Sequence, residues 1–206
     1  MLTSAGITNK SLEMALRKLV KGEIKIVFIP TSANIEESEK SWLIKDLVNC
    51  QKLGSVDIVD ISAMDKELWL PRLKKANVIF MGGGNTMYLM KWIRKSGLID
   101  ELPNLLKSRV YVGISAGSIV LNPKLIAGSQ YLFSKKQPET GLGFVDFYFR
   151  PHLNSPHFPK IRGGILRKLL TRFDSELYAV DDESGVVVID GKIEVVSEGK
   201  WIKYSV

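Results

Sequence analysis

The chain has 206 residues, 45% of them apolar and 25% charged, which is typical of a soluble globular protein with one domain over residues 1–206. It has no run of 18 apolar residues and does not open with a basic segment followed by an apolar one, so we expect neither a membrane span nor a secretory signal. The net charge of +7 comes from scattered short basic pairs, which favours a solvated surface that attracts small acidic molecules over one that binds nucleic acid.

The first half of the chain alternates predicted strands with predicted helices. Runs rich in β-branched residues indicate buried strands, and apolar residues spaced at i, i+3, i+4 and i+7 indicate amphipathic helices. We expect strands at 2–4, 24–29, 56–61, 78–81 and 110–112. We expect helices at 11–21, 37–53, 65–75, 87 to about 97, and 99–107. This alternation predicts an α/β fold with a mostly parallel central sheet and helices on both faces.

The second half of the chain has a different pattern. The stretch 125–144 has no regular period and contains several glycines, so we expect long loops that contribute to function. A strand at 145–150 and a helix at 159–173 follow. Four short strands at 178–180, 185–189, 192–196 and 201–204, with hairpin turns at Asp190-Gly191 and Glu198-Gly199, predict a small C-terminal β-meander.

A G-x-S-x-G sequence, Gly113 to Gly117, lies directly after the strand at 110–112 and before a predicted helix. A hydroxyl on such a strand-to-helix turn is lifted clear of the sheet, and the glycines leave room for a substrate. Ser115 is therefore a candidate nucleophile, and the backbone N–H of Ala116 is a candidate donor to an oxyanion.

A serine nucleophile needs a base, and the chain offers only two histidines, His152 and His157. His152 is the better candidate because Pro151 fixes its position at the end of a predicted strand, where the sites of parallel α/β folds gather. The alternative is a surface histidine that makes a hydrogen bond within its loop.

The triple glycine at 82–84 follows another predicted strand and can bring backbone N–H groups close to a substrate. A nucleotide-binding loop and a simple tight turn are the alternatives. The last glycine of G-x-G-x-x-G is missing, and no acidic residue ends the following strand, which argues against a dinucleotide site. The sequence also has no P-loop, no paired-cysteine site and no H-E-x-x-H motif, so we expect no metal and no cofactor.

Three motifs together, at 80–86, 113–118 and 151–152, resemble the peptidase E (aspartyl dipeptidase) family in order and spacing. The segment 180–184, which is followed by predicted strands, also fits the pattern of this family. The resemblance implies a sheet related to class I glutamine amidotransferases, with serine at their cysteine position. It also implies cleavage of dipeptides and short peptides with an N-terminal aspartate, without a cofactor.

Carried onto this chain, the resemblance makes Ser115 the nucleophile and His152 the general base and later acid. Gly84 and Ala116 offer oxyanion N–H groups, and Asn85 shapes the glycine loop and is expected among the substrate-binding residues. An arginine shortly after the histidine is expected to hold the aspartate side chain of the substrate.

Arg162 occupies the position of that arginine. A guanidinium binds a carboxylate with two parallel hydrogen bonds, which supplies both strength and geometry. The alternative is a solvated residue at the start of a helix.

The chain departs from the family pattern at one position. The family places an acid about fifteen residues after the serine, and this chain has Gln130 there. Three outcomes remain open: a Ser–His pair of low activity, another acid such as Glu139 or Asp146, or a changed substrate.

The leading hypothesis is a cytoplasmic serine peptidase acting on small acidic peptides. The alternatives are a cyanophycinase-like hydrolase and an inactive relative that binds an acidic peptide or metabolite. A glutamine amidotransferase is excluded because the elbow holds serine and the single cysteine, Cys50, lies far upstream. That lone cysteine also excludes an internal disulfide and fits a reducing cytoplasm. A homodimer is compatible with the sequence.

Overall fold

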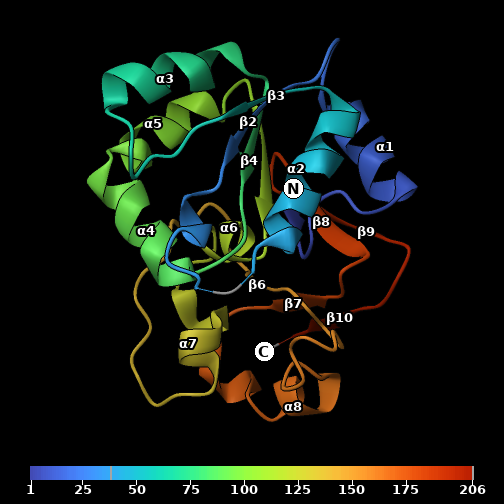
Figure 1. Cartoon of the computed structure of the whole chain (residues 1–206). Coiled ribbons are helices and arrows are strands. Elements are labelled where there is room, and N and C mark those ends of the chain that lie inside the picture. The colour runs from blue at the N-terminus through green and yellow to red at the C-terminus, as the bar shows by residue number, and fades with distance from the viewer. Residues whose placement is uncertain (38, 206) are drawn as a thin grey trace.

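The computed structural model describes residues 1–37 and 39–205 and confirms the α/β class with a mostly parallel central sheet (Figure 1). The described strands of the main sheet lie in the order β3-β2-β4-β5-β1-β8-β9. Their bounds are β1 (Leu2–Thr3), β2 (Lys25–Ile29), β3 (Ser55–Ile58), β4 (Val78–Met81), β5 (Val110–Ile114), β8 (Ser184–Ile189) and β9 (Lys192–Ser197). The five strands from β3 to β1 are parallel, and β8 and β9 extend the sheet antiparallel.

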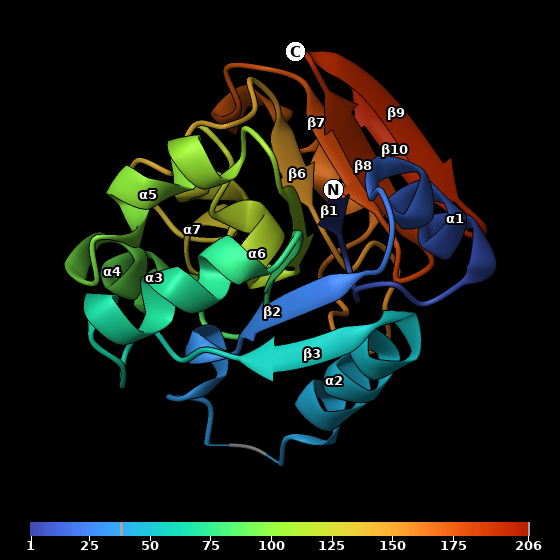
Figure 2. The same ribbon diagram turned by 90° about the horizontal axis from the view of Figure 1, so that it is seen from above.

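Helices cover both faces of this sheet, as Figure 2 shows from above. One face carries α1 (Lys10–Leu19) and α2 (Ser41–Leu53), and the other carries α3 (Lys66–Lys75), α4 (Thr86–Lys95), α5 (Leu98–Leu105) and α6 (Ala116–Ile119). Side chains of β2 alternate between the two cores: Ile26 and Phe28 pack under α1 and α2, and Val27 and Ile29 pack on the opposite face. The β-branched runs in the sequence therefore read as strands because both of their faces are buried.

The C-terminal strands divide between two sheets, so the predicted β-meander is wrong in its connections. A second, three-stranded sheet has the order β10-β7-β6, with β6 (Tyr148–Arg150), β7 (Leu177–Val180) and β10 (Trp201–Tyr204). The turn at Asp190 and Gly191 does join β8 to β9 as a hairpin, and both residues have positive φ. The segment at Glu198 and Gly199 instead crosses between the sheets.

Asp181 holds that crossing in place, because its carboxylate accepts hydrogen bonds from the Lys200 N–H and the Ser184 hydroxyl. β8 pairs with β1 because the buried face of β8 completes the core of the main sheet. Short-range alternation in the sequence cannot distinguish these partners.

Several predicted bounds also shift. The helix expected from residue 37 begins at Ser41, and residue 38 lies outside the described part of the chain. The helix expected at 159–173 is reduced to α8 (Gly163–Arg167) and a 3₁₀ turn at Leu170–Arg172, because Gly163 and Gly164 weaken its start. The loops expected at 125–144 contain a 3₁₀ turn at Leu125–Ala127 and α7 (Ser129–Leu132). None of the helices in residues 1–37 and 39–205 is long and apolar enough to cross a membrane.

Candidate active site

Ser115 lies at the carboxyl end of β5, which is flanked by β4 and β1 in the middle of the sheet. Its backbone is strained, with φ 49° and ψ −105°, values that a non-glycine residue adopts only where its surroundings enforce them. The Ser115 N–H donates to Thr3 O at 3.0 Å, and its carbonyl accepts from Ser118 N at 2.9 Å and Ile119 N at 3.0 Å. The sequence motif therefore forms the predicted strand–turn–helix elbow.

Gly117 is required for this turn. A Cβ at that position would lie 2.0 Å from Met81 O on the neighbouring strand β4, so no side chain fits. The close approach of α6 to β4 depends on this glycine and carries the elbow over the end of the sheet.

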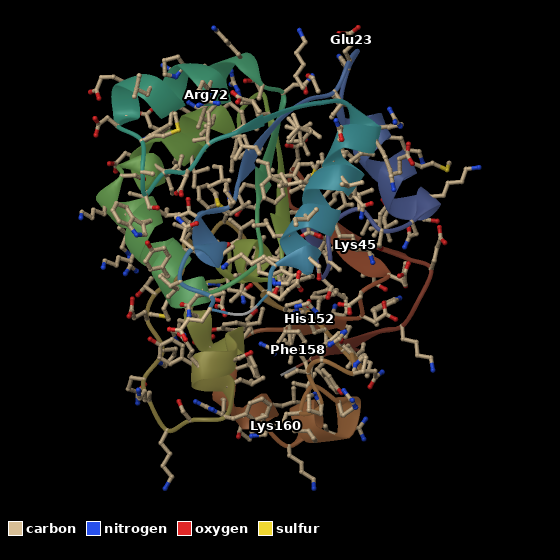
Figure 3. All side chains as sticks on the ribbon, viewed as in Figure 1. Glu23, Lys45, Arg72, His152, Phe158 and Lys160 are labelled. Carbon is tan, nitrogen blue, oxygen red and sulfur yellow. The ribbon has the colours of Figure 1, made fainter. Side chains whose placement is uncertain are left out.

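His152 contacts Ser115 directly. It lies just after β6, with φ 65°, and its Nε2 is 2.8 Å from Ser115 Oγ. Its backbone N–H donates to Ser4 Oγ at 2.9 Å. The ring of Phe158 stacks on the imidazole with 4.1 Å between centroids and 7° between planes, and Figure 3 shows the two side chains together below α2. The imidazole is therefore held from its backbone, its face and both nitrogens.

Asp182 stands behind His152. Its Oδ1 lies 2.8 Å from His152 Nδ1 and accepts a 2.5 Å hydrogen bond from the Ser4 hydroxyl. Burial alone raises the pKa of Asp182, but hydrogen bonds from His152 and Ser4 outweigh it and lower that pKa to about 2. The carboxylate is thus charged at neutral pH and aimed at the imidazole.

The residues that the sequence offered as the orienting acid lie elsewhere. Gln130 is exposed, and its Nε2 contacts Asn85 Oδ1 at 3.4 Å instead of His152. Glu139 pairs with Arg94 at 3.0 Å, and Asp146 is exposed and is not part of the wall of the cleft around Ser115. The departure from the family pattern at residue 130 therefore does not leave the histidine without an acid.

Asp182 lies in the segment 180–184, which was expected only to fit the family pattern. A stronger signal was available, because Asp181 and Asp182 directly follow a buried strand, β7. β7 pairs in parallel with β6, so the carboxyl ends of both strands meet and bring Asp182 beside His152.

Two backbone N–H groups near Ser115 are free to bind an oxyanion. Among the hydrogen bonds of the described residues, neither Gly84 N nor Ala116 N donates one. Gly84 lines the cleft, and Ala116 directly follows Ser115 in the elbow. The Cα of Gly83 lies against the Ser115 side chain, because a Cβ on Gly83 would be 3.5 Å from Ser115 Cβ. The Gly84 and Ala116 N–H groups therefore remain candidates for the oxyanion pair.

Ser32, which the sequence reasoning missed, fixes the glycine loop. Its hydroxyl contacts the carbonyls of Gly82, at 2.9 Å, and Gly83, and its own carbonyl accepts from Asn85 N at 2.9 Å. In a trans peptide the C=O and the next N–H point in opposite directions, so holding Gly83 O turns the Gly84 N–H away from Ser32. Gly84 has φ 131°, and a Cβ there would lie 2.4 Å from Ser32 O, so only glycine allows this packing.

Asn85 has a structural role at this loop. Its Oδ1 accepts from Tyr88 N at 3.0 Å and caps the start of α4. A contact between Asn85 and a substrate stays a prediction.

A cleft of about 1180 Å³ opens above Ser115 and His152. Asn85, Gln130 and His157 also line it, and His157 is exposed and does not contact Ser115 among the described hydrogen bonds. Among the described residues, no group of three or more histidine, cysteine, aspartate or glutamate side chains lies close enough together to hold a metal ion.

Arg162 lies behind the cleft wall. Its Nη1 donates to the carbonyls of Ser155 at 3.2 Å, Phe158 at 3.1 Å and Ile161 at 3.0 Å, so it holds the loop that carries the ring stacked on His152. Its Nε and Nη2 donate no hydrogen bond to the described residues.

The guanidinium that does lie in the wall is Arg150, at the end of β6. It is only 1% exposed and donates to Ala127 O and, at 3.1 Å, to Ser129 Oγ. Its Nε has no hydrogen-bond partner and no carboxylate of the described residues pairs with it, and burial lowers its pKa to about 10. Two cationic groups, Arg150 and Arg162, therefore flank the site.

Taken together, the geometry gives a hydroxyl, an imidazole and a carboxylate in a hydrogen-bonded row, with two free backbone donors beside the hydroxyl. This arrangement can move a proton from serine to histidine and stabilise negative charge on a carbonyl oxygen, which is what acyl transfer requires.

Comparison with known proteins identifies the family of the chain. The sequence pattern of peptidase family S51 matches residues 1–196. An uncharacterized peptidase of Pasteurella multocida is 27% identical, over 79% of this chain and 80% of its own length. A peptidase E of Escherichia coli is 26% identical, over 90% of this chain and 75% of its own length.

The fold also matches solved structures. A peptidase from an acI-B1 actinobacterium superposes with a TM-score of 0.76 at 23% identity, covering 97% of this chain and 87% of that one. A candidate peptidase E protein of Listeria monocytogenes superposes with a TM-score of 0.72 at 20% identity, covering 100% of this chain and 96% of that one. Because the family pattern spans nearly the whole chain, the chain belongs to peptidase family S51, a family of serine peptidases.

Proposed function

We propose that this protein is a serine peptidase that hydrolyses dipeptides and short peptides with an N-terminal aspartate. The observation that carries the proposal is the row Ser115–His152–Asp182, with 2.8 Å between each pair of interacting atoms, at the floor of a large cleft. Family membership and the resemblance to peptidase E support the choice of an aspartyl substrate.

The first half of the reaction follows from this row. The Ser115 hydroxyl donates to His152 Nε2 and attacks the carbonyl carbon of the Asp–X bond as its proton passes to the imidazole. Asp182, already ionised, accepts from Nδ1 and stabilises the imidazolium. The Gly84 and Ala116 N–H groups receive the negative charge that forms on the carbonyl oxygen.

The second half regenerates the enzyme. His152 gives its proton to the nitrogen of the leaving residue, and the bond to that nitrogen breaks to leave an aspartyl ester on Ser115. Water then loses a proton to His152 and attacks the ester carbonyl. The bond to Ser115 Oγ breaks as His152 returns that proton to it, which releases aspartate and restores the Ser115 hydroxyl and the neutral imidazole.

Arg162 and Arg150 are the candidate anchors for the aspartate side chain. The resemblance favours Arg162, whose Nε and Nη2 remain available. Arg162 does not line the cleft, and its Nη1 is bonded to the loop that carries Phe158. Arg150 lies in the wall itself, with no acidic partner among the described residues.

The non-enzymatic alternative rested on the absent acid at residue 130. With Asp182 hydrogen-bonded to His152, that argument no longer applies. Nothing in the described residues favours a cyanophycinase-like substrate over an aspartyl peptide.

An aspartyl p-nitroanilide and the dipeptide Asp-Leu test the proposal directly. Wild-type protein should release product from both, and a fluorophosphonate should label it at a single serine. Ser115→Ala should abolish turnover and labelling. Ser41→Ala, which removes an exposed hydroxyl from the same cleft, should retain both. Turnover that survives in Ser115→Ala would contradict the mechanism, and a wild-type protein that is labelled yet cleaves no aspartyl substrate would contradict the specificity.

A further inference from the structure

Asp46 on α2 is a carboxyl group that the proposed mechanism does not use. Its side chain faces the cleft and is only 9% exposed. A Cβ on Gly6 would lie 3.9 Å from its Oδ1, which places the carboxylate beside the segment that carries Ser4, the hydroxyl donor to Asp182. Asp46 therefore reaches the same cleft from the α2 side.

Asp46 has no partner among the described residues. No hydrogen bond to its carboxylate and no ion pair within 4.0 Å are present in residues 1–37 and 39–205, although most other buried polar side chains are satisfied. Burial raises its pKa to about 7, and the neighbouring Lys45 offsets this only in part. A buried, unpaired carboxylate destabilises the folded protein, so the fold gains nothing from this residue as it stands.

The surroundings of Asp46 favour a cation over an anion. Glu36 and Glu39 line the same side of the cleft, and the Asn49 side chain lies one helical turn further along α2. Lys45 is exposed, and Figure 3 shows it at the end of α2 that faces His152 and Phe158. The arginine in the wall, Arg150, belongs to the other sheet, at the end of β6. Around α2 the cleft therefore carries three acids, Glu36, Glu39 and Asp46, against one lysine, Lys45, and the buried guanidinium lies elsewhere in its wall.

We propose that Asp46 receives a cationic group of the substrate and so makes the cleft selective for peptides that carry an ammonium ion. An aspartyl dipeptide offers two sources of that charge, its α-amino group and a basic side chain on its second residue. The proposal rests on the proposed function for the identity of the ligand, but it concerns binding and does not depend on turnover.

Binding to the Ser115→Ala protein, measured by calorimetry, tests it with matched ligands. Asp-Leu carries the α-ammonium, succinyl-Leu has the same skeleton without it, and Asp-Lys adds a second ammonium. Introducing Asp46→Asn into Ser115→Ala should weaken Asp-Leu at least about tenfold and change succinyl-Leu less than about twofold. If Asp46 instead receives the basic side chain of the second residue, the loss of affinity should be confined to Asp-Lys.

A control separates the net charge of this face from the charge at Asp46. Glu37→Gln removes an exposed acid of the neighbouring segment that does not line the cleft, and it should change none of the three affinities by more than about threefold. The melting temperature supplies an independent readout at pH 8: Asp46→Asn should raise it, because an unpaired buried charge is removed, whereas a structural role predicts a fall.

Equal losses for Asp-Leu and succinyl-Leu, unchanged affinities for all three ligands, or no binding of any ammonium ligand would overturn the proposal. Turnover by the wild-type protein is scored separately. If Asp-Leu binds through Asp46 but is not cleaved, the proposed function fails and the ammonium site stands. If Asp-Leu is cleaved and Asp46→Asn has no selective effect on binding, the ammonium site fails and the proposed function stands.

Discussion

Replacing Asp182 by asparagine tests whether the carboxylate behind His152 completes the site. The amide keeps nearly the same shape and can still contact Nδ1, but it removes the negative charge that faces the imidazolium. In a serine protease with a Ser-His-Asp arrangement, this kind of change lowers kcat about 10⁴-fold, equivalent to ~5.5 kcal/mol of barrier. Because the Asp182 side chain is 37% exposed, solvent screens part of its charge, and we expect a loss of about 10³-fold here.

The same change has a smaller effect on stability. The pKa of Asp182 is lowered from 3.8 to about 2, so its charged form stabilises the folded protein above pH 4, and this stabilisation is lost as pH falls from about 4 to 2. With screening at a partly exposed site, we expect about 1 kcal/mol, or a few degrees in melting temperature, at neutral pH. A loss of kcat caused by unfolding would require a far larger change.

The assay compares kcat on aspartyl p-nitroanilide at pH 7.5 for wild type, Asp182→Asn and Gln130→Ala. Gln130→Ala should stay within about threefold of wild type, because Gln130 contacts Asn85 and not His152. The reasoning is refuted if Asp182→Asn keeps more than a tenth of the wild-type kcat, or if Gln130→Ala shows the larger loss.

Three further predictions follow from other parts of the cleft. Ser32→Ala should lower kcat about 10- to 100-fold with little change in KM, because the Gly84 N–H loses its orientation; equal effects on kcat and KM would argue for general damage to the loop. The preference for aspartate is the ratio of kcat/KM on Asp-Leu to kcat/KM on Ala-Leu. If Arg162 or Arg150 anchors the aspartate side chain, replacing that arginine by methionine should lower this ratio at least about tenfold. An unchanged ratio in both Arg162→Met and Arg150→Met would reject both residues as anchors. Asp46→Asn should raise the free energy of unfolding at pH 8 by about 1 to 4 kcal/mol, because the wild-type carboxyl loses stability between about pH 4 and 7, where the folded protein holds a proton that the unfolded chain releases. Chemical denaturation of both proteins at pH 4 and pH 8 measures this gain, and an equal gain at the two pH values would contradict the prediction.

Much of the fold could be predicted from the sequence because its buried strands leave a local pattern. The runs that became β2, β4 and β5 are covered on both faces and read as strands without any knowledge of their neighbours. The elbow at Ser115 was equally visible, since a strand, a turn of small residues and a helix follow one another within a few positions. The C-terminal strands were visible as strands, but their assignment to two sheets depends on pairing that the local pattern does not encode.

The amino-acid sequence by itself determined the elbow, the glycine loop and the order of Ser115 and His152, because each of these is a local arrangement of backbone and turn residues. Only the tertiary structure decided which acid meets the histidine, since Asp182 arrives on β7 through parallel pairing with β6 and not through proximity along the chain. The positions of Arg150 and Asp46 in the cleft were likewise decided only by the tertiary structure. Burial without an opposite charge distinguishes them from the many exposed charged residues of the chain, and burial is a property of packing among distant segments.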